Sequence, residues 1–214
     1  MQKNSFNRKL LLLIIFLLAL LPAVSSQSQE EATKYIIAEP SYLRVHGTST
    51  LNNFTIHAEA MKAELRLPDA GRDSLSFQAI SSDPRGAVTV PVQELHGGNA
   101  LFNRDLHHAL EAKKYPEVIY QLTAFRPGDN LVTEPDWRLI QTKGRLTITD
   151  LTRTIRMEIL GRWSQPDRIE FKGNKILTIS EFGVTPPTRF FGALRVSDTV
   201  TVDFYLHLQP EGEE

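Results

Sequence analysis

The stretch LFNRDLHHALEAKKYPEVIYQLTAF, residues 101–125, decides the fold class, because a short helix leads directly into an alternating strand. Three apolar residues recur at the spacing of one helical face, and they predict a helix packed on a larger body: Leu106, Ala109 and Leu110. Asn103 is expected to cap the first turn of this helix. Pro116 forces the preceding residue out of helical geometry and therefore ends it.

After Pro116 the period of the apolar residues changes from about 3.6 to 2, which is the period of a strand. One face of this strand is expected to carry Val118, Tyr120, Leu122 and Ala124. The other face also holds apolar residues, Ile119 and Phe125 among them. This is the pattern of a strand with apolar groups on both faces.

The rest of the chain shows strand and turn patterns only. Alternating segments predict strands near residues 35–38, 42–45, 54–65, 75–79, 88–92, 137–140, 146–148, 155–159, 169–171, 176–179 and 200–208. A change of phase before Met61 predicts a bulge or bend, residues 150–152 predict a hairpin connection, and Gly173-Asn174 predicts a turn. Roughly eight to ten strands with one short helix and no internal repeat favour an all-β fold, either an antiparallel barrel or a sandwich.

The N-terminus has the layout of a secretory signal peptide, expected at residues 1–26. Three basic residues precede an unbroken apolar run from Leu10 to Leu21, and small residues follow Pro22. Twelve apolar residues are fewer than the roughly 20 that a spanning helix needs, so a permanent membrane anchor is the less favoured alternative. We expect a disordered leader at residues 27–33, a barrel domain at 34–209, an acidic tail at 210–214, and a periplasmic or secreted location.

Charge and cysteine content exclude several classes of protein. Loss of the signal peptide would remove three of the 24 basic residues and no acidic ones, which leaves 21 basic against 25 acidic residues. A net charge of −4 gives no electrostatic basis for binding nucleic acid. The absence of cysteine excludes disulfides and a lipid attached to cysteine, so the fold must be stabilised by its core.

Four segments of the chain resemble the YceI-like proteins, a family of exported or periplasmic β-barrels associated with binding polyisoprenoid lipids. They are LRVHGTSTLNNF (43–54), NRDLHHALEAKKYPEVIY (103–120), GRLTITDLTR (144–153), and Phe182-Gly183 followed by VSDTVTVDFYLHL (196–208). Two departures mark a divergent member: residues 150–152 replace a glycine-valine-threonine turn, and Tyr35 stands where the family commonly has tryptophan. The resemblance implies a lipocalin-like antiparallel barrel of about eight strands, closed near one end by the helix, with an apolar tunnel along its axis.

The resemblance also implies a ligand, either a polyisoprenoid or another long apolar small molecule held in the barrel lumen. The candidate ligand-binding residues are Phe54, Leu106, Leu110, Tyr115, Tyr120, Phe190, Phe191 and Phe204. The alternative for each aromatic residue is that it simply fills the barrel. Arg104 and Arg189 are candidates for contact with an anionic head group. We expect no cofactor, and a homodimer is compatible with the sequence.

Catalytic and metal sites are not indicated by the residues. His107 and His108 project about 100° and 200° from Leu106, so they do not point together, and His46 with His57 lacks a third ligand. No serine lies in a nucleophile-elbow motif. The alternative function is an enzyme, a hydrolase or isomerase acting on a hydrophobic substrate in the same cavity. Asp203 and His207 are the pair to examine for it, but strand alternation predicts that both face solvent.

Overall fold

The computed structural model describes residues 32–68, 85–131, 136–165, 167–186, 188–189 and 194–212. Their elements are β1 (Ala32–Ser49), β2 (Asn53–Ala58), β3 (Lys62–Pro68), β4 (Arg85–Pro91), η2 (Val92–Glu94), β5 (Leu95–His96), α3 (Ala100–Ala109), β6 (Glu117–Leu131), β7 (Arg138–Ile148), β8 (Leu151–Gln165), β9 (Arg168–Thr178), η3 (Ile179–Phe182), β10 (Thr188–Arg189) and β11 (Leu194–Pro210). The expected signal peptide and the strand expected at 75–79 lie outside the described residues. No helix within the described ranges is long and apolar enough to cross a membrane.

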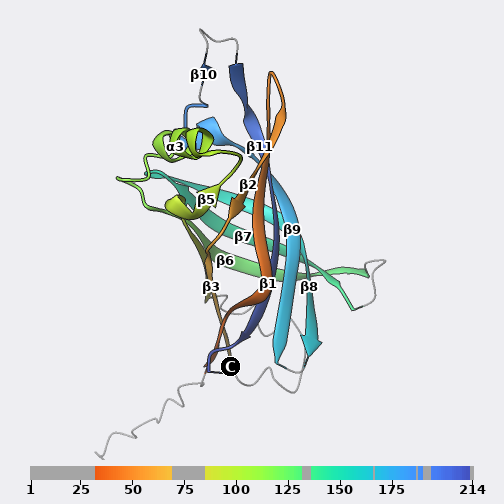
Figure 1. The fold of residues 1–214 in the computed structure, drawn as a ribbon. Coiled ribbons are helices and arrows are strands. Elements are labelled where there is room, and N and C mark those ends of the chain that lie inside the picture. Colours follow the sequence, from red (N-terminus) through yellow and green to blue (C-terminus); the bar gives the residue numbers. More distant parts are fainter. Residues whose placement is uncertain are drawn as a thin grey trace, which may run out of the picture. The chain divides into compact units, whose positions relative to one another are not determined.

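Eight strands close into an antiparallel barrel, which confirms the expected fold class (Figure 1). The order around the barrel is β1, β11, β9, β8, β7, β6, β4 and β3, and β3 pairs with β1 again. The ladder between β1 and β11 begins at Tyr35, opposite Pro210, and reaches Ser49. This pairing of the first strand with the last removes both free edges of the sheet.

The long strand β1 pairs with two strands in succession along the same edge. Ala32 to Ile36 pair with β3, and Arg44 to Thr48 pair with β2. The expected change of phase before Met61 is confirmed, because it falls at the break between β2 and β3. β2 then pairs with β5, so these two short strands extend the wall beside α3.

Two local expectations about β1 and α3 are wrong. The two strands expected at 35–38 and 42–45 are one strand that runs through residues 39–41. The Ser41 hydroxyl supports it there, because it donates to Ala38 O at 2.6 Å and accepts from His207 N at 2.9 Å. The pairing of β1 with β11 shifts its register here, between Ala38 and Tyr42, and the hydrogen bonds of this hydroxyl bridge the shift. The residue that caps α3 is Asn99, whose side-chain oxygen accepts from Phe102 N at 3.0 Å, and Asn103 lies inside the helix.

The expected turn at Gly173-Asn174 is also wrong, since β9 runs through it and pairs with β11 from Ile169 to Thr178. Gly173 is favoured there for a packing reason: a Cβ atom would lie 3.1 Å from Ile159 and 3.2 Å from Phe204. The hairpin between β7 and β8 is confirmed with a tighter turn than expected. Ile148 pairs with Leu151, so only two residues form the turn.

The two ends of the described barrel segment differ slightly from the expected boundaries. β1 begins at Ala32, two residues before the expected domain start. β11 runs to Pro210, and Glu211 N donates to Lys34 O at 2.8 Å. The Glu211 carboxylate also lies 2.7 Å from Lys34 Nζ. Pro210 and Glu211 are therefore part of the barrel end.

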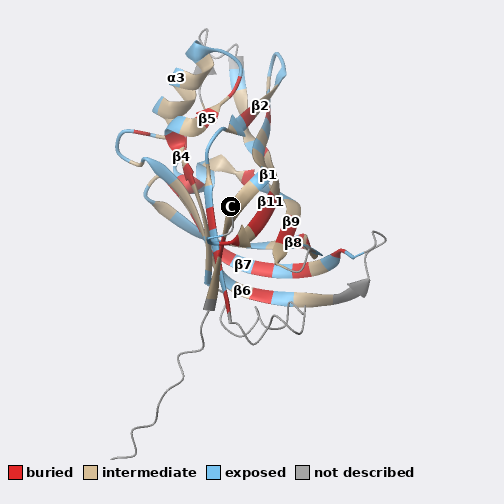
Figure 2. Ribbon diagram, turned by 60° about the horizontal axis from the view of Figure 1, so that its bottom comes forward, coloured by how far each residue is buried: buried red, intermediate tan, exposed pale blue. Residues whose placement is uncertain are grey.

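One half of the barrel interior is filled by its own side chains. The residues of this packed half include Tyr35, Leu65, Leu67, Phe125, Ile140, Ile159, Ile169, Phe171, Leu206 and Leu208. Phe125 and Phe171 meet edge to face with ring centroids 6.3 Å apart. Figure 2 shows the alternation that produces this core: buried and exposed residues follow one another along β7.

A polar cluster on the outer face joins β8, β9 and β11. The carboxylate of Glu170 is buried and lies 2.7 Å from the Arg162 guanidinium. Burial favours a raised pKa for Glu170, but hydrogen bonds from Tyr205, Ser164 and Arg162 outweigh it and hold this pKa below its ordinary value. Burial and the neighbouring Glu170 raise the pKa of Tyr205 to about 12. The cluster therefore keeps a charged carboxylate under the protein surface.

Candidate ligand-binding cavity

The other half of the barrel encloses a cavity of about 620 Å³. All eight barrel strands, together with β2 and α3, contribute side chains to its wall. Its floor is formed by residues of the packed half, including Phe125, Phe171 and Leu208. Most of the wall consists of aliphatic and aromatic side chains, because the inward positions of the alternating strands are apolar.

The helix α3 lies across one end of the barrel (Figure 1), and its side chains line the cavity there, so we refer to it as the lid. Its apolar stripe faces the lumen through Phe102, Leu106, Ala109 and Leu110. The Phe102 ring packs on Phe54 of β2 with centroids 5.3 Å apart. No residue of the lid is fully buried, so it rests on the barrel by partial contacts.

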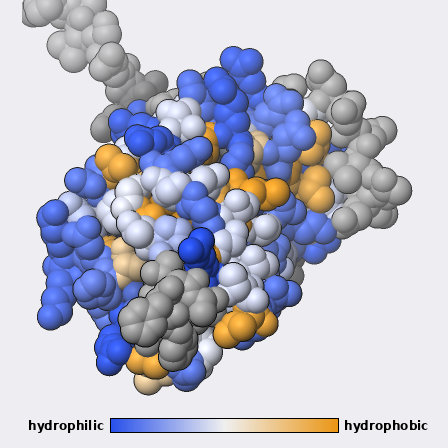
Figure 3. Space-filling view, turned by 90° about the horizontal axis from the view of Figure 1, so that it is seen from above, coloured by the Kyte–Doolittle hydropathy of each residue, from blue (hydrophilic) through white to orange (hydrophobic). Residues whose placement is uncertain are grey.

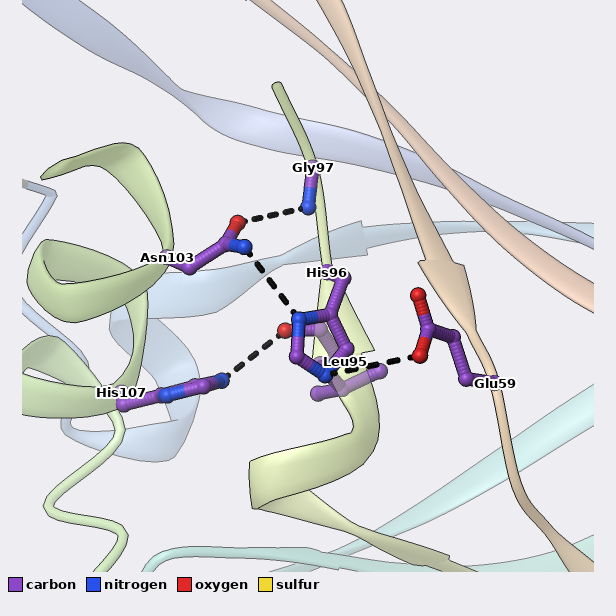
Figure 4. A network of polar contacts seen from close by, with 6 residues as sticks. All are labelled: Glu59, Leu95, His96, Gly97, Asn103 and His107. Carbon is purple, nitrogen blue, oxygen red and sulfur yellow. Dashed lines mark hydrogen bonds and ion pairs between the residues drawn. The ribbon is translucent and has the colours of Figure 1, made fainter. Parts of the chain in front are cut away.

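Polar contacts also attach the lid to β5, as Figure 4 shows. The Asn103 side-chain oxygen accepts from Gly97 N at 2.8 Å, so its amide nitrogen faces His96 Nδ1 at 3.2 Å and donates to it. His107 Nε2 donates to Leu95 O at 2.9 Å. Three hydrogen bonds from α3 thus supplement the apolar contacts of the lid.

The polar part of the cavity wall lies mostly at the lid end. It includes Ser49, Asn52 and Asn53 from the turn between β1 and β2, and Asn99 and Asp105 from the lid. Figure 3 views the molecule from this end and shows orange hydrophobic patches among mainly blue and white residues. This end offers uncharged hydrogen-bonding groups and one carboxylate beside an apolar interior.

Tyr120 of β6 lies across Gly144 of β7 inside the cavity. A Cβ atom on Gly144 would overlap the Tyr120 ring, so glycine is the residue that leaves room for it. The Tyr120 hydroxyl is buried and has no hydrogen-bond partner among the residues that the structure describes. Burial raises the pKa of Tyr120, and the nearby Thr142 hydroxyl opposes this in part. The phenol is therefore uncharged, and its ring forms part of the apolar wall.

The structure places five of the candidate ligand-binding residues in the cavity wall: Phe54, Leu106, Leu110, Tyr120 and Phe204. Tyr115 is not one of the wall residues and packs instead with Lys114, whose Nζ lies 4.6 Å from the ring centroid. Phe190 and Phe191 lie outside the described residues. The wall positions follow from strand alternation and from the helical stripe, which are the patterns that selected them.

Neither head-group candidate is placed in the described part of the cavity wall. The Arg104 side chain is 72% exposed, lies 3.8 Å from Asp105, and is not in the cavity wall. Arg189 pairs with Leu194 in the ladder of β10 and β11, and its side chain lies outside the described part of the chain.

The pair considered for catalysis does not reach the lumen. Asp203 and His207 lie on the outer face, as alternation predicts, and neither contributes to the cavity wall. The expectation that His207 faces solvent is wrong, because it is buried and its Nδ1 donates to Glu39 O at 2.8 Å. His107 takes part in the lid attachment, where its Nε2 lies 2.9 Å from Leu95 O.

Sequence reasoning missed one cluster with metal-ligand chemistry, formed by Glu59, Glu94 and His96. Their ligand atoms lie within 4.8 Å of one another, and His96 Nε2 is 3.9 Å from Glu59. Asn103 donates to Nδ1 of His96, so the ring proton of the neutral imidazole is on Nε2. A metal bound to Nε2 would force that proton onto Nδ1, where it would face the amide hydrogens of Asn103. The lid attachment therefore opposes metal binding here, and Glu59 is too far away in sequence for spacing to reveal the cluster.

Comparisons with known proteins agree with this architecture. The family model of the YceI-like domain matches residues 40–208 of this chain. The crystal structure of BcnA from Burkholderia cenocepacia is similar, with a TM-score of 0.62, 17% identity, and coverage of 78% of this chain and 95% of that one. No curated protein matches the chain.

Two further solved structures share the fold. A polyisoprenoid binding domain from Saccharophagus degradans, implicated in plant cell wall breakdown, has a TM-score of 0.62 and 13% identity, over 84% of this chain and 99% of that one. The YCEI protein of Campylobacter jejuni has a TM-score of 0.51 and 16% identity, over 74% and 85% of the two chains.

Proposed function

Because this chain belongs to the family of YceI-like domains, we propose that it is an exported, non-enzymatic protein that binds an apolar, lipid-like molecule in its barrel. The proposed ligand is a polyisoprenoid or another long hydrocarbon chain. The proposed location is the periplasm or the exterior of the cell, reached by cleavage of the signal peptide at residues 1–26.

The observation that carries this proposal is the apolar cavity of about 620 Å³ inside the closed barrel. Ligand cavities in proteins commonly span about 300–1,000 Å³. Each methylene group that moves from water into such a cavity gains about 0.8 kcal/mol, so a long hydrocarbon chain can offset the entropy that association costs. The solved structure from Saccharophagus degradans has a similar fold and is a polyisoprenoid binding domain, which supports the choice of ligand class.

Binding is tested by two measurements on the purified mature chain. Extraction with organic solvent followed by mass spectrometry should recover a lipid, and delipidated protein should bind farnesol in isothermal titration calorimetry. Leu106→Trp fills the cavity from the lid, and it should weaken farnesol binding at least tenfold. Leu101→Trp is the matched control, because Leu101 is on the same helix with 47% of its surface exposed.

Either of two results would contradict binding in the lumen. One is protein that carries no lipid and does not bind farnesol. The other is equal loss of affinity in both tryptophan variants. Export is tested separately by fractionating cells and determining the N-terminal residue of the chain. An intact chain that stays in the cytoplasm would contradict that part of the proposal.

A further inference from the structure

Lys175 of β9 occupies an inward-facing position of the barrel. Odd-numbered residues of this strand face the interior, and they include Ile169, Phe171 and Leu177. Even-numbered residues face outward: Lys172 lies 4.2 Å from the centroid of the Trp137 ring on the outer surface, and Ile176 is 63% exposed. Lys175 is accordingly part of the cavity wall. Alternation thus places an ammonium group where the neighbouring inward residues are apolar.

The wall beside Lys175 lacks a strand ladder. β8 and β9 pair with each other over only part of their length, from Leu160 opposite Lys172 to Gln165 opposite Arg168. The strands are still close at Gly173, where a Cβ atom would lie 3.1 Å from Ile159. Beyond it, residues 151–159 of β8 pair with β7 alone and residues 173–178 of β9 pair with β11, with no pairing between the two described segments. We refer to this unpaired part of the wall as the β8–β9 gap.

The Lys175 side chain spans this gap. Its Nζ donates to the backbone oxygen of Arg156 in β8 at 3.0 Å. An ammonium carries three donors, and this carbonyl uses one of them without supplying a counter-charge. Among the described residues, no carboxylate forms an ion pair with Lys175. The ammonium is therefore available to an anion at the edge of the apolar cavity.

The charges of the cavity wall distinguish this position from the lid end. The charged residues of the wall are Glu64, Asp105 and Lys175, so Lys175 is its one cation within the described part of the chain. Asp105 would repel an anion at the lid end. An oxyanion joined to a hydrocarbon tail is best accommodated with its charge at the β8–β9 gap and its tail in the lumen.

We propose that Lys175 binds the anionic head group, a phosphate or carboxylate, of the lipid held in the barrel. This inference rests on the proposed function and narrows its ligand class from apolar, lipid-like molecules in general to lipids with an anionic head group. The head group is a further acceptor for the ammonium, which has two donors left beside the bond to Arg156 O, and it supplies the counter-charge that this carbonyl lacks. Such a bond adds roughly tenfold or more to affinity.

The test compares farnesyl phosphate, farnesol and inorganic phosphate as probes of the delipidated protein by calorimetry. Wild type should bind farnesyl phosphate about tenfold more tightly than farnesol. Lys175→Gln should abolish this preference, whereas Lys175→Arg should keep it. Lys143→Gln is the matched control, because Lys143 is an exposed outward residue of β7. The preference is a ratio within each variant, so a general loss of stability does not mimic the result.

Each contrary outcome has a separate meaning. A preference that survives Lys175→Gln, or a wild type with no preference, overturns the head-group assignment while farnesol binding still supports the proposed function. Binding of inorganic phosphate as tightly as farnesyl phosphate overturns it too, because the anion site would then be independent of the lipid. Failure of both farnesol and farnesyl phosphate to bind overturns the proposed function itself.

Discussion

Replacement of Gly144 by alanine should destabilise the barrel by forcing Tyr120 away from β7. The added Cβ atom would lie 2.5 Å from the Tyr120 hydroxyl oxygen and closer still to the ring, where ordinary contact needs about 3.5 Å. The ring must therefore move by about 1 Å. Overpacking of this kind costs roughly 1–3 kcal/mol. The cavity lies beside the ring and can receive it, so we expect about 1–2 kcal/mol for Gly144→Ala.

The assay is equilibrium unfolding in urea of four proteins: wild type, Gly144→Ala, Tyr120→Leu and the double variant. In the Tyr120→Leu background the same alanine should be neutral or should stabilise by about 0.4–1 kcal/mol, because alanine restricts the unfolded chain more than glycine does. The coupling energy between the two sites should therefore exceed 1 kcal/mol. A coupling below about 0.5 kcal/mol would refute the argument that Gly144 is needed for the Tyr120 ring.

Two further predictions concern the outer cluster and the lid. Because the pKa of Glu170 lies below its ordinary value, its charge stabilises the fold above about pH 4.3 and this contribution is lost as the pH falls through the lowered pKa. Glu170→Gln should therefore lower the free energy of unfolding in urea by about 3 kcal/mol at pH 7, and by progressively less as the pH falls. A loss of stability that does not change with pH would contradict this reasoning. Asn103→Ala removes the acceptor of Gly97 N, so amide exchange at Gly97 should accelerate at least tenfold; unchanged protection would show that Asn103 does not hold the lid.

The features predictable from sequence were those with a regular period. The helical stripe that ends at Leu110 and the alternation around Tyr120 identify both elements of the segment at 101–125 and their inward faces as far as Leu122. Beyond it the expected face is wrong, because a register shift turns Phe125 inward in place of Ala124. The same alternation places Phe54 and Phe204 in the cavity wall. Period alone leaves barrel and sandwich open, because closure depends on the pairing of β1 with β11, between residues far apart in the chain.

The wrong expectations share a physical cause. Gly173-Asn174 has the composition of a turn, but pairing with β11 and contact with Ile159 keep it in a strand. Residues 39–41 have the composition of a break, but Ser41 supplies the hydrogen bonds that carry β1 across it. In both places a long-range contact overrides the local preference. Lys175 was missed for a similar reason, since its inward position depends on β9 being continuous.

The division of the interior into a packed half and a hollow half separates two requirements on the sequence. Side chains around Ile140 and Ile169, which are fully buried, hold the cylinder together whether or not a guest is present. Residues around the hollow half form further buried clusters, and they also set the shape of the space that a guest would occupy. Substitutions of side chains that point into the hollow half can therefore reshape the cavity while the packed half keeps the barrel closed.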